Sequence, residues 1–351
     1  MYTDNIAVAE DTKYVDLRSD TVTRACPEMR KVMAEAIVGD DVYSEDPTVL
    51  ALEQRCAKLF NKEAALFVVS GTMGNLLSIM AHTLGRGEIL IGRTSHIQRW
   101  ELGGYARIAG VSAVTIDVNP DGTLNLGQIK EAICPGDCHR AQTKLICVEN
   151  TQNFTGGKAI SVEYMQKIRD IADSANLKVH VDGARLFNAA VKLGVSVAEL
   201  TKHADSVQMC FSKGLGAPVG TIITGTTEFI RQARLDRKVL GGGWRQAGHL
   251  AAAAMYALDH GYDWIAADNN RAVRLAQAIN QFGSKKITAD EDGITNMVLV
   301  TVADPENAVS ILKKHGVLAM HFDVNRIRAV IHRDIDDAGI EKAINAFQAL
   351  A

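Results

Sequence analysis

The chain has 351 residues, 47% of them hydrophobic, and a formal net charge of -3 at pH 7. This charge balance offers no basic surface, so neither a nucleic acid nor a membrane is an expected partner. No apolar run approaches the ~20 residues of a membrane-spanning helix. Because a single core stops growing near ~250–300 residues, the length predicts about two domains.

We expect residues 1–15 to form an N-terminal extension or arm. They lack a basic start, an apolar block and a cleavage site, so we expect neither a secretory signal nor a transit peptide. Cys56, Cys147 and Cys210 lie in apolar runs and are interpreted as buried thiols, which favours a reducing compartment, the cytoplasm. The segment CPGDCHR (134–140) has no second ligand cluster at matching spacing, so we expect a polar loop and no metal site.

Short apolar runs alternate with amphipathic stretches from residue 64 onward. The expected strands cover residues 64–70, 88–92, 111–117, 143–150, 178–182 and 205–213. Helical patterns follow several of these strands, at residues 72–84, 161–177 and 195–204. This alternation predicts an α/β fold with a mostly parallel central sheet and helices on both faces.

The pattern changes near residue 255. A long helical pattern is followed by strands and helices in irregular order. These later elements are expected at 255–282, 286–290, 295–302, 305–316, 326–334 and 338–351. We therefore predict a large domain at 16–254 and a smaller α+β C-terminal domain at 255–351.

Two charged residues lie where apolar strands end. Lys213 follows Asp182 by 31 residues, about one βαβ unit, so both are expected at one edge of the sheet. The simpler interpretation is an ion pair of the buried Asp182 with Arg185 or with Lys213. The glycines and proline of GLGAPVG (214–220) indicate instead that something bulky approaches the backbone after Lys213.

A lone lysine, a buried acid and a helix N-terminus together match the needs of pyridoxal 5′-phosphate (PLP). Ser70, Gly71 and Thr72 join a strand to a helix, where backbone N–H groups and hydroxyls can hold a phosphate. An ordinary N-cap explains the same three residues. Lys213 would bind PLP as an imine, which explains a lysine in an apolar run, and Asp182 would keep the pyridine nitrogen protonated.

With these residues in place, the sequence resembles the L-threonine aldolase family, fold-type I PLP enzymes grouped with the aromatic amino-acid β-eliminating lyases. Seven motifs carry the resemblance: DLRSDTVT (16–23), GDDVYSEDPTV (39–49), SGTMGN (70–75), HVDGARLFNA (180–189), SKGLGAPVG (212–220), GGGWRQAG (241–248) and RAVIH (328–332). The resemblance implies a fold-type I PLP-dependent transferase-like fold with residues 16–254 as the PLP-binding domain. It also implies a lyase that cleaves a small-molecule amino-acid substrate, L-threonine or L-allo-threonine, to glycine and acetaldehyde. The implied assembly is a homotetramer, a dimer of dimers with active sites at subunit interfaces.

The resemblance also assigns residue roles. Lys213 would be the Schiff-base lysine, Asp182 the partner of the pyridine nitrogen, and Arg185 a contact of the ring hydroxyl. His96 would stack on the face of PLP and help as a base. Gly71 and Thr72 would bind the phosphate of PLP. Ser19 and Arg328 would bind the substrate carboxylate. Tyr43 and Arg245 would lie at the site, one or both contributed by a neighbouring subunit.

The chain departs from the family pattern at Gln152, Gln98, Trp100 and Trp244. Gln152 replaces a histidine near the substrate's β-hydroxyl, and a glutamine cannot act as a general base. Gln98 and Trp100 replace tyrosines, and Trp244 replaces a common methionine and would narrow the pocket toward small side chains.

These departures leave several functions open. An aldolase is the main prediction. In that case the departures are sequence variation within the family, and His96 and a bound water are sufficient for aldol chemistry. The alternatives on the same scaffold are a PLP-dependent racemase of a small amino acid such as alanine, a β-eliminating lyase, or a non-catalytic binding subunit. Among the other residues, His180 and His332 are interpreted as structural strand residues, 231–240 as a solvated helix face, and Trp264 as packing between the domains.

Overall fold

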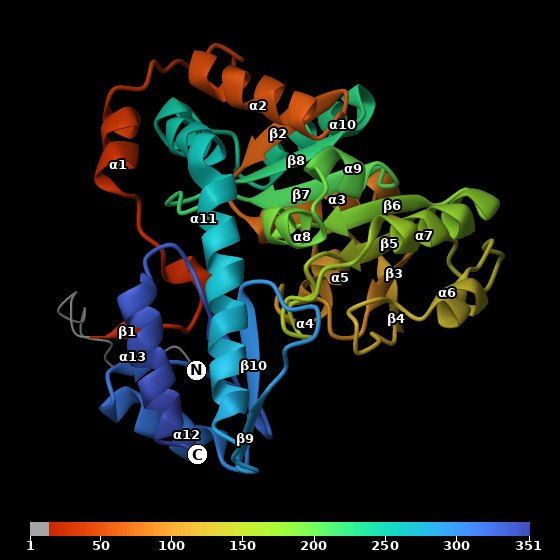
Figure 1. The fold of residues 1–351 in the computed structure, drawn as a ribbon. Helices are drawn as coiled ribbons and strands as arrows, with labels where there is room; N and C mark the ends of the chain where they lie inside the picture. The colour runs from red at the N-terminus through yellow and green to blue at the C-terminus, as the bar shows by residue number, and fades with distance from the viewer. Residues whose placement is uncertain (1–13) are drawn as a thin grey trace.

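A seven-stranded sheet forms the centre of the larger part of the protein, whose computed structural model describes residues 14–351 (Figure 1). In spatial order its strands are β2 (Ala64–Val68), β8 (Thr221–Gly225), β7 (Ser206–Cys210), β6 (Lys178–Asp182), β5 (Thr143–Glu149), β3 (Glu88–Gly92) and β4 (Ser112–Ile116). Within this sheet β8 pairs antiparallel with both neighbours, and the other pairings are parallel. The predicted mostly parallel α/β sheet is therefore confirmed, whereas residues 1–13 of the predicted extension lie outside the described residues.

Helices cover both faces of this sheet, because the strands carry apolar side chains on both faces. On β2, Leu66 and Val68 pack with α3 (Gly71–Thr83) and α10 (Thr227–Val239), whereas Phe67 belongs to the larger core on the opposite face. The helices that contribute to that larger core are α1 (Pro27–Ala34), α2 (Pro47–Leu59), α6 (Leu126–Ala132), α7 (Val162–Ser174), α8 (Leu186–Leu193), α9 (Val197–Thr201) and the first half of α11 (Gly248–Gln281). The remaining helices of this part are the 3-10 helix η1 (Asp20–Val22), α4 (His96–Arg99) and α5 (Gly104–Arg107).

A second core forms around a four-stranded antiparallel sheet. Its strands in spatial order are β12 (Met320–Asp323), β13 (Arg326–Val330), β10 (Met297–Val302) and β9 (Ile287–Ala289). It packs with α12 (Pro305–Lys314), α13 (Asp337–Gln348) and the second half of α11. A short strand, β1 (Val15–Asp16), pairs with β11 (Val317–Leu318), and the following Leu17 is buried in this second core.

The helix α11 runs through both parts of the molecule (Figure 1). It begins at Gly248, ahead of the expected residue 255, because Asp46 accepts the Gly248 backbone N–H at 2.8 Å and caps this end. Asp46 is distant in sequence, so the local pattern carries no sign of this cap. Ile265 belongs to the larger core and Ala272 to the smaller one, so the two cores meet along one continuous helix.

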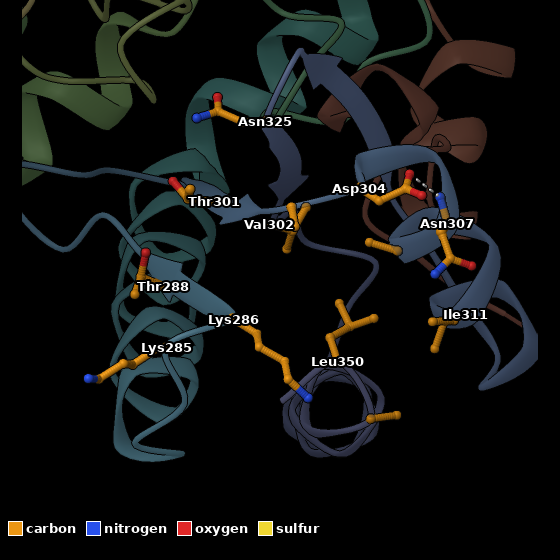
Figure 2. A pocket seen from close by; sticks show the side chains of 13 residues that line it. Lys285, Lys286, Thr288, Thr301, Val302, Asp304, Asn307, Ile311, Asn325 and Leu350 are labelled. Carbon is orange, nitrogen blue, oxygen red and sulfur yellow. Dashed lines mark hydrogen bonds between the residues drawn. The ribbon is translucent and has the colours of Figure 1, made fainter.

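A pocket of about 640 Å³ opens on the smaller part (Figure 2). Apolar side chains, including Val302, Ile311 and Leu350, form part of its wall, and Asp304 caps α12 by accepting the backbone N–H of Asn307 at 3.0 Å. None of the residues with a predicted cofactor or substrate role lines this pocket. In the described part of the chain, no helix combines the length and apolar composition needed to cross a bilayer.

Candidate active site

Asp182 is the last residue of β6 and is 2% exposed. Its carboxylate accepts hydrogen bonds from the side-chain amides of Gln208 and Asn75, the latter at 2.9 Å, and from a backbone N–H at 3.2 Å. Burial raises the pKa of Asp182, but the charges of His96 and Lys213 and the Asn75 hydrogen bond outweigh burial, so the net pKa is lowered. Asp182 is therefore a buried carboxylate held in its ionised form.

Lys213 lies in the loop that joins β7 to β8 and is half-buried. Because β6 and β7 are neighbouring parallel strands, with Asp182 opposite Gln208, Asp182 and Lys213 lie at the same edge of the sheet, as their spacing predicts. The carbonyl of Lys213 accepts the Thr23 hydroxyl at 2.9 Å and the Gly216 N–H at 2.8 Å. These two bonds fix the backbone from which the lysine side chain extends.

The glycines after Lys213 make room for the protein itself. A Cβ atom at Gly214 would lie 2.7 Å from Cδ1 of Ile265 on α11. At Gly216, where φ is +73°, a Cβ atom would lie 2.7 Å from the Arg333 side chain. The interpretation that these glycines admit a cofactor is therefore wrong at both positions. Arg333 also stacks 3.7 Å above the ring of Trp264, so Trp264 contacts the C-terminal part, as expected.

Arg185 pairs with Asp20 rather than with Asp182. Its Nε and Nη2 donate to the two Asp20 oxygens at 2.6 and 2.5 Å, and both side chains are buried. The interpretation of Arg185 as the counterion of Asp182 is therefore wrong. Burial raises the pKa of Asp20, but the Arg185 guanidinium outweighs burial and brings it down to about 2. Asn296, from the segment before β10, also donates to Asp20 at 3.3 Å.

His96 begins α4 and forms a pair with Glu101. The His96 Nδ1 atom lies 2.8 Å from Glu101 Oε1, and the Glu101 side chain is only 5% exposed. Burial lowers the pKa of His96, but the Glu101 hydrogen bond and the charges of Asp182 and Glu101 outweigh it and raise the pKa. Among the described residues, the ligand-type atoms of His96, Glu101 and Asp182 lie within 4.8 Å of one another. Hydrogen bonds from His96 and Asn75 hold the two carboxylates together.

The helix α3 begins at Gly71, after the N-cap Ser70. The Ser70 hydroxyl accepts the backbone N–H of Met73 at 3.2 Å, as the N-cap interpretation expects. The first N–H groups of a helix have no partner within it, so those of Gly71 and Thr72 can receive an anion. A Cβ atom at Gly71 would lie 2.8 Å from Cys210 Sγ, so this glycine lets the helix approach β7 closely.

Among residues 14–351, Arg328 is a buried cation without an acidic partner. Its Nη1 donates to the side-chain oxygen of Asn153 at 2.9 Å and its Nη2 to the Arg18 carbonyl at 3.4 Å, while Nε has no partner. Burial and the charge of Arg185 lower the pKa of Arg328 to about 10. Ser19, next to Arg18, is half-buried, and its hydroxyl accepts hydrogen bonds from Thr21. Arg328 is thus placed to receive a carboxylate from a ligand.

Gln152 is buried, with one half of its amide already used. Its Oε1 accepts the Thr155 backbone N–H at 3.0 Å, and its Nε2 has no partner among the described residues. The Gln152 backbone forms a bridge with Lys158. The N–H groups of the Gln152 side-chain amide therefore remain available to a ligand.

Tyr43 and Arg245 lie on the surface of the chain. Tyr43 is 72% exposed, and Arg245 pairs with Asp40 at 2.7 Å. Trp244 packs edge-on against the core residue Phe67, with ring centroids 5.0 Å apart. Within one chain the ring of Trp244 therefore packs against the core, and its effect on the width of a substrate pocket stays a prediction.

Three buried polar residues near Asp182 were not predicted from the sequence: Asn75, Glu101 and Glu149. Glu149 ends β5 and accepts the backbone N–H of His96 at 2.6 Å. Burial and the charge of Asp182 raise the pKa of Glu149 to about 7. An acid at the end of an apolar strand was a usable signal for Glu149. Asn75 and Glu101 carry no such signal, because their neighbours come from distant segments.

The residues fit PLP. A pyridinium nitrogen needs an ionised carboxylate, which the buried and hydrogen-bonded Asp182 provides. A phosphate needs unpaired N–H groups, which the first turn of α3 provides. A covalent anchor needs a lysine at the same strand edge, which Lys213 provides.

Comparison with known proteins identifies the chain's relatives. The model of the beta-eliminating lyase family matches residues 16–305. An uncharacterized protein of Caenorhabditis elegans, R102.4, is 54% identical over 95% of this chain and 83% of its own length. Low-specificity L-threonine aldolase 1 of Arabidopsis thaliana is 45% identical over 95% of this chain and 95% of its own length. The solved structure of Leishmania major threonine aldolase has a TM-score of 0.83 at 18% identity, with 95% of this chain and 99% of that chain covered, and so shares the fold.

Proposed function

The chain belongs to the beta-eliminating lyase family, and we propose that it is a PLP-dependent aldolase that cleaves L-threonine or L-allo-threonine to glycine and acetaldehyde. The observation that carries this function is the similarity to low-specificity L-threonine aldolases over nearly the whole length of both chains. The proposal agrees with the main prediction from the sequence. The relatives give no support to a racemase, and Lys213, Asp182 and Arg328 are the parts that a catalyst of this class needs.

Five residues would hold PLP: Lys213, Asp182, Arg185, Gly71 and Thr72. Bound PLP supplies an electron sink for the charge that remains on Cα when the bond between Cα and Cβ breaks. Asp182 would pair with the pyridine nitrogen of PLP, because three hydrogen bonds and nearby cations stabilise its ionised form. The unpaired N–H groups of α3 would bind the phosphate.

Arg328 and Ser19 would bind the substrate carboxylate. The Arg328 guanidinium has no carboxylate of its own, so a substrate carboxylate would relieve its unfavourable burial. Asn153 orients the guanidinium through Nη1. This pairing would select amino acids over amines and fix the direction in which the substrate enters.

His96 would take the proton from the substrate's β-hydroxyl. Glu101 binds Nδ1 of His96, which leaves Nε2 as the basic nitrogen. Gln152 would assist only as a hydrogen-bond donor to the β-oxygen, because its own carbonyl is bound by Thr155. A donor at Gln152 would then stand where the family pattern has a histidine, and His96 would act as the base.

The test is a product assay with the purified PLP-loaded enzyme. Release of acetaldehyde from L-threonine and L-allo-threonine, measured with alcohol dehydrogenase, is the expected result. L-alanine is incubated in parallel and its enantiomers are separated. Formation of D-alanine without aldehyde from any β-hydroxy amino acid would replace the aldolase by the racemase.

We further propose a homotetramer, built as a dimer of dimers, that works in the cytoplasm. Exposed Tyr43, Trp100 and Leu102 are large apolar side chains that a subunit contact would cover. The family resemblance places Tyr43 and Arg245 at the active site, one or both of them from a neighbouring subunit, and both are exposed here. The six unpaired cysteines suit a reducing compartment. Light scattering after gel filtration measures the mass, and a monomer that retains full activity would contradict the shared site.

A further inference from the structure

A chain of hydrogen bonds leads from Asp182 through the sheet and away from the candidate active site. Its links join side chains of α3, β6 and β7. They are Asp182 to Asn75 (2.9 Å), Asn75 to His180 (3.1 Å), His180 to Ser206 (2.9 Å) and Ser206 to His82 (2.7 Å). Asn75, His180 and Ser206 are essentially inaccessible to solvent. Water therefore does not compete for these bonds.

Chemistry fixes the direction of each bond. Both N–H groups of the Asn75 amide are used, one by Asp182 Oδ2 and one by Glu101 Oε1 at 2.8 Å. The Asn75 oxygen can only accept, so His180 must carry its proton on Nε2. Nδ1 of a neutral His180 then accepts the Ser206 hydroxyl, whose oxygen is free to accept from His82 Nε2. Every donor in the chain points toward the two carboxylates.

The surroundings keep both histidines neutral, as this direction requires. Burial lowers the pKa of His180 to about 4, despite the nearby charge of Asp182. Burial, with the charge of His180, lowers the pKa of His82 to about 3. The ring of His82 also stacks on Phe229, with centroids 4.7 Å apart, which holds the far end of the chain in place.

We propose that His180 is a positioning residue whose Nε2 proton locks the Asn75 amide, so that Asn75 donates at once to Asp182 and to Glu101. Asp182 would face the pyridine nitrogen of bound PLP and Glu101 contacts His96, so one amide would align both halves of the catalytic machinery. An inverted amide would turn its oxygen toward two carboxylates and would be repelled. The inference rests on the proposed function, and it gives His180 a role beyond the structural one expected from the sequence.

The first test needs neither PLP nor activity. Nitrogen-15 NMR of the histidine rings in the apoprotein reports which nitrogen carries the proton. The expected result is a neutral His180 with its proton on Nε2 near neutral pH. A proton on Nδ1, or a doubly protonated ring, would overturn the proposal. If this test succeeds and the enzyme releases no acetaldehyde, the proposed function has failed while the hydrogen-bond chain stands.

The second test compares two replacements of His180 of similar size. His180→Gln keeps an N–H group near the position of Nε2, whereas His180→Asn places its amide near Nδ1 and loses that donor. We expect His180→Asn to lower kcat by about 10–100-fold with KM little changed, as for other groups that orient a catalytic residue, and His180→Gln to recover most of the loss. In protein loaded with PLP labelled at the ring nitrogen, the nitrogen-15 shift should move toward the neutral pyridine in His180→Asn only. Equal activity per bound PLP in both variants, with an unchanged shift, would contradict the proposal.

Ser206→Ala provides a milder variant in case His180→Asn does not fold. It removes the hydroxyl that donates to Nδ1, and a buried alanine in β7 creates little strain. We expect a mixture of both His180 protonation sites in the NMR spectrum and a smaller loss of kcat than in His180→Asn. A single unchanged Nε2–H form with full kcat would show that Ser206 has no part in the chain.

Discussion

Two buried charges at the candidate site, Asp182 and Arg328, have different kinds of partner. Asp182 receives several hydrogen bonds and lies near cations, whereas Arg328 has a carbonyl, an amide oxygen and a sulfur as its partners but no carboxylate. Burying an ion without a counterion is unfavourable, so the free protein carries a cost at Arg328 that an anionic ligand would remove. Asp182 is already stabilised in its ionised form. Incomplete pairing of a buried charge therefore indicates a place where a charged ligand can bind, whereas complete pairing indicates a charge that the fold itself stabilises.

Arg328→Gln should weaken substrate binding without destabilising the protein. We expect KM for L-threonine to rise by about 10–100-fold, because charge-assisted hydrogen bonds to a carboxylate contribute about 1.5–3 kcal/mol each. The KM of Arg328→Lys should lie between those of the native protein and of Arg328→Gln, because an ammonium group cannot reproduce the planar, two-pronged hydrogen bonding of a guanidinium. Urea unfolding of the apoprotein should show equal or greater stability for Arg328→Gln, since an unpaired buried cation is removed. An unchanged KM would exclude Arg328 from carboxylate binding.

Glu101→Gln should shift the pH dependence of the reaction. Glu101 and Asp182 raise the pKa of His96, so the basic form of His96 is lost as the pH falls through this raised value. Glutamine keeps a hydrogen-bond acceptor for Nδ1 and removes the charge, so the pKa of His96 should fall. The acidic limb of kcat/KM should therefore move to lower pH, and kcat should fall by about tenfold as the base weakens. Asp117→Asn, at an exposed carboxylate, serves as the control and should leave the limb in place.

At the scale of elements, the sequence pattern was sufficient to predict a helix or strand wherever the residues that shape it are close in sequence or the strand is apolar on both faces. The strand at 88–92 was predicted with its observed bounds, and the run at 143–150 contains β5. The start of α11 was missed because its cap, Asp46, comes from a distant segment. The loop after Lys213 was predicted, but its glycines were misassigned because their neighbours, Ile265 and Arg333, are remote in sequence.

The candidate site follows the same rule. Asp182 and Lys213 were identifiable because a charge that ends an apolar strand is visible in one dimension. The link from His180 through Asn75 to Glu101 joins β6, α3 and the segment after α4, and no spacing in the chain reports it. Arg185 was expected to pair with Asp182, yet the acid that it meets is Asp20. A pattern shows that a charge needs a partner, but only the fold decides which partner it meets.

Gly214→Ala tests the contact between the lysine loop and α11. The added methyl group would lie 2.7 Å from Cδ1 of Ile265, so the variant should lose about 1–3 kcal/mol of unfolding free energy. Ile265→Val removes that Cδ1 atom, and the double variant should be less destabilised than the sum of the two single variants. Urea unfolding of all four proteins measures the coupling. Strict additivity would show that the two residues do not compete for space.

At the scale of the whole molecule, Asp20 joins parts of the chain that are otherwise separate. It lies in the N-terminal 3-10 helix η1 and binds Arg185 from the segment after β6 and Asn296 from the segment before β10. The first contact belongs to the large sheet and the second to the smaller core. A single buried carboxylate thereby ties the N-terminal segment to both parts around the candidate site.

Asp20→Asn should destabilise the protein and change how its stability depends on pH. It leaves Arg185 buried without a counterion, which costs about 3–5 kcal/mol. In the native protein the pKa of Asp20 lies at about 2, below its value in an unfolded chain of about 3.9. The stability that Asp20 contributes is therefore complete above about pH 4 and is lost as the pH falls toward 2.

Urea unfolding at a series of pH values should show a smaller loss of stability over this acidic range in Asp20→Asn than in the native protein. Asp292→Asn, at a side chain that is 94% exposed, is the matched control and should follow the native curve. Parallel acid curves for Asp20→Asn and the native protein would show that the Asp20 pair does not carry this dependence.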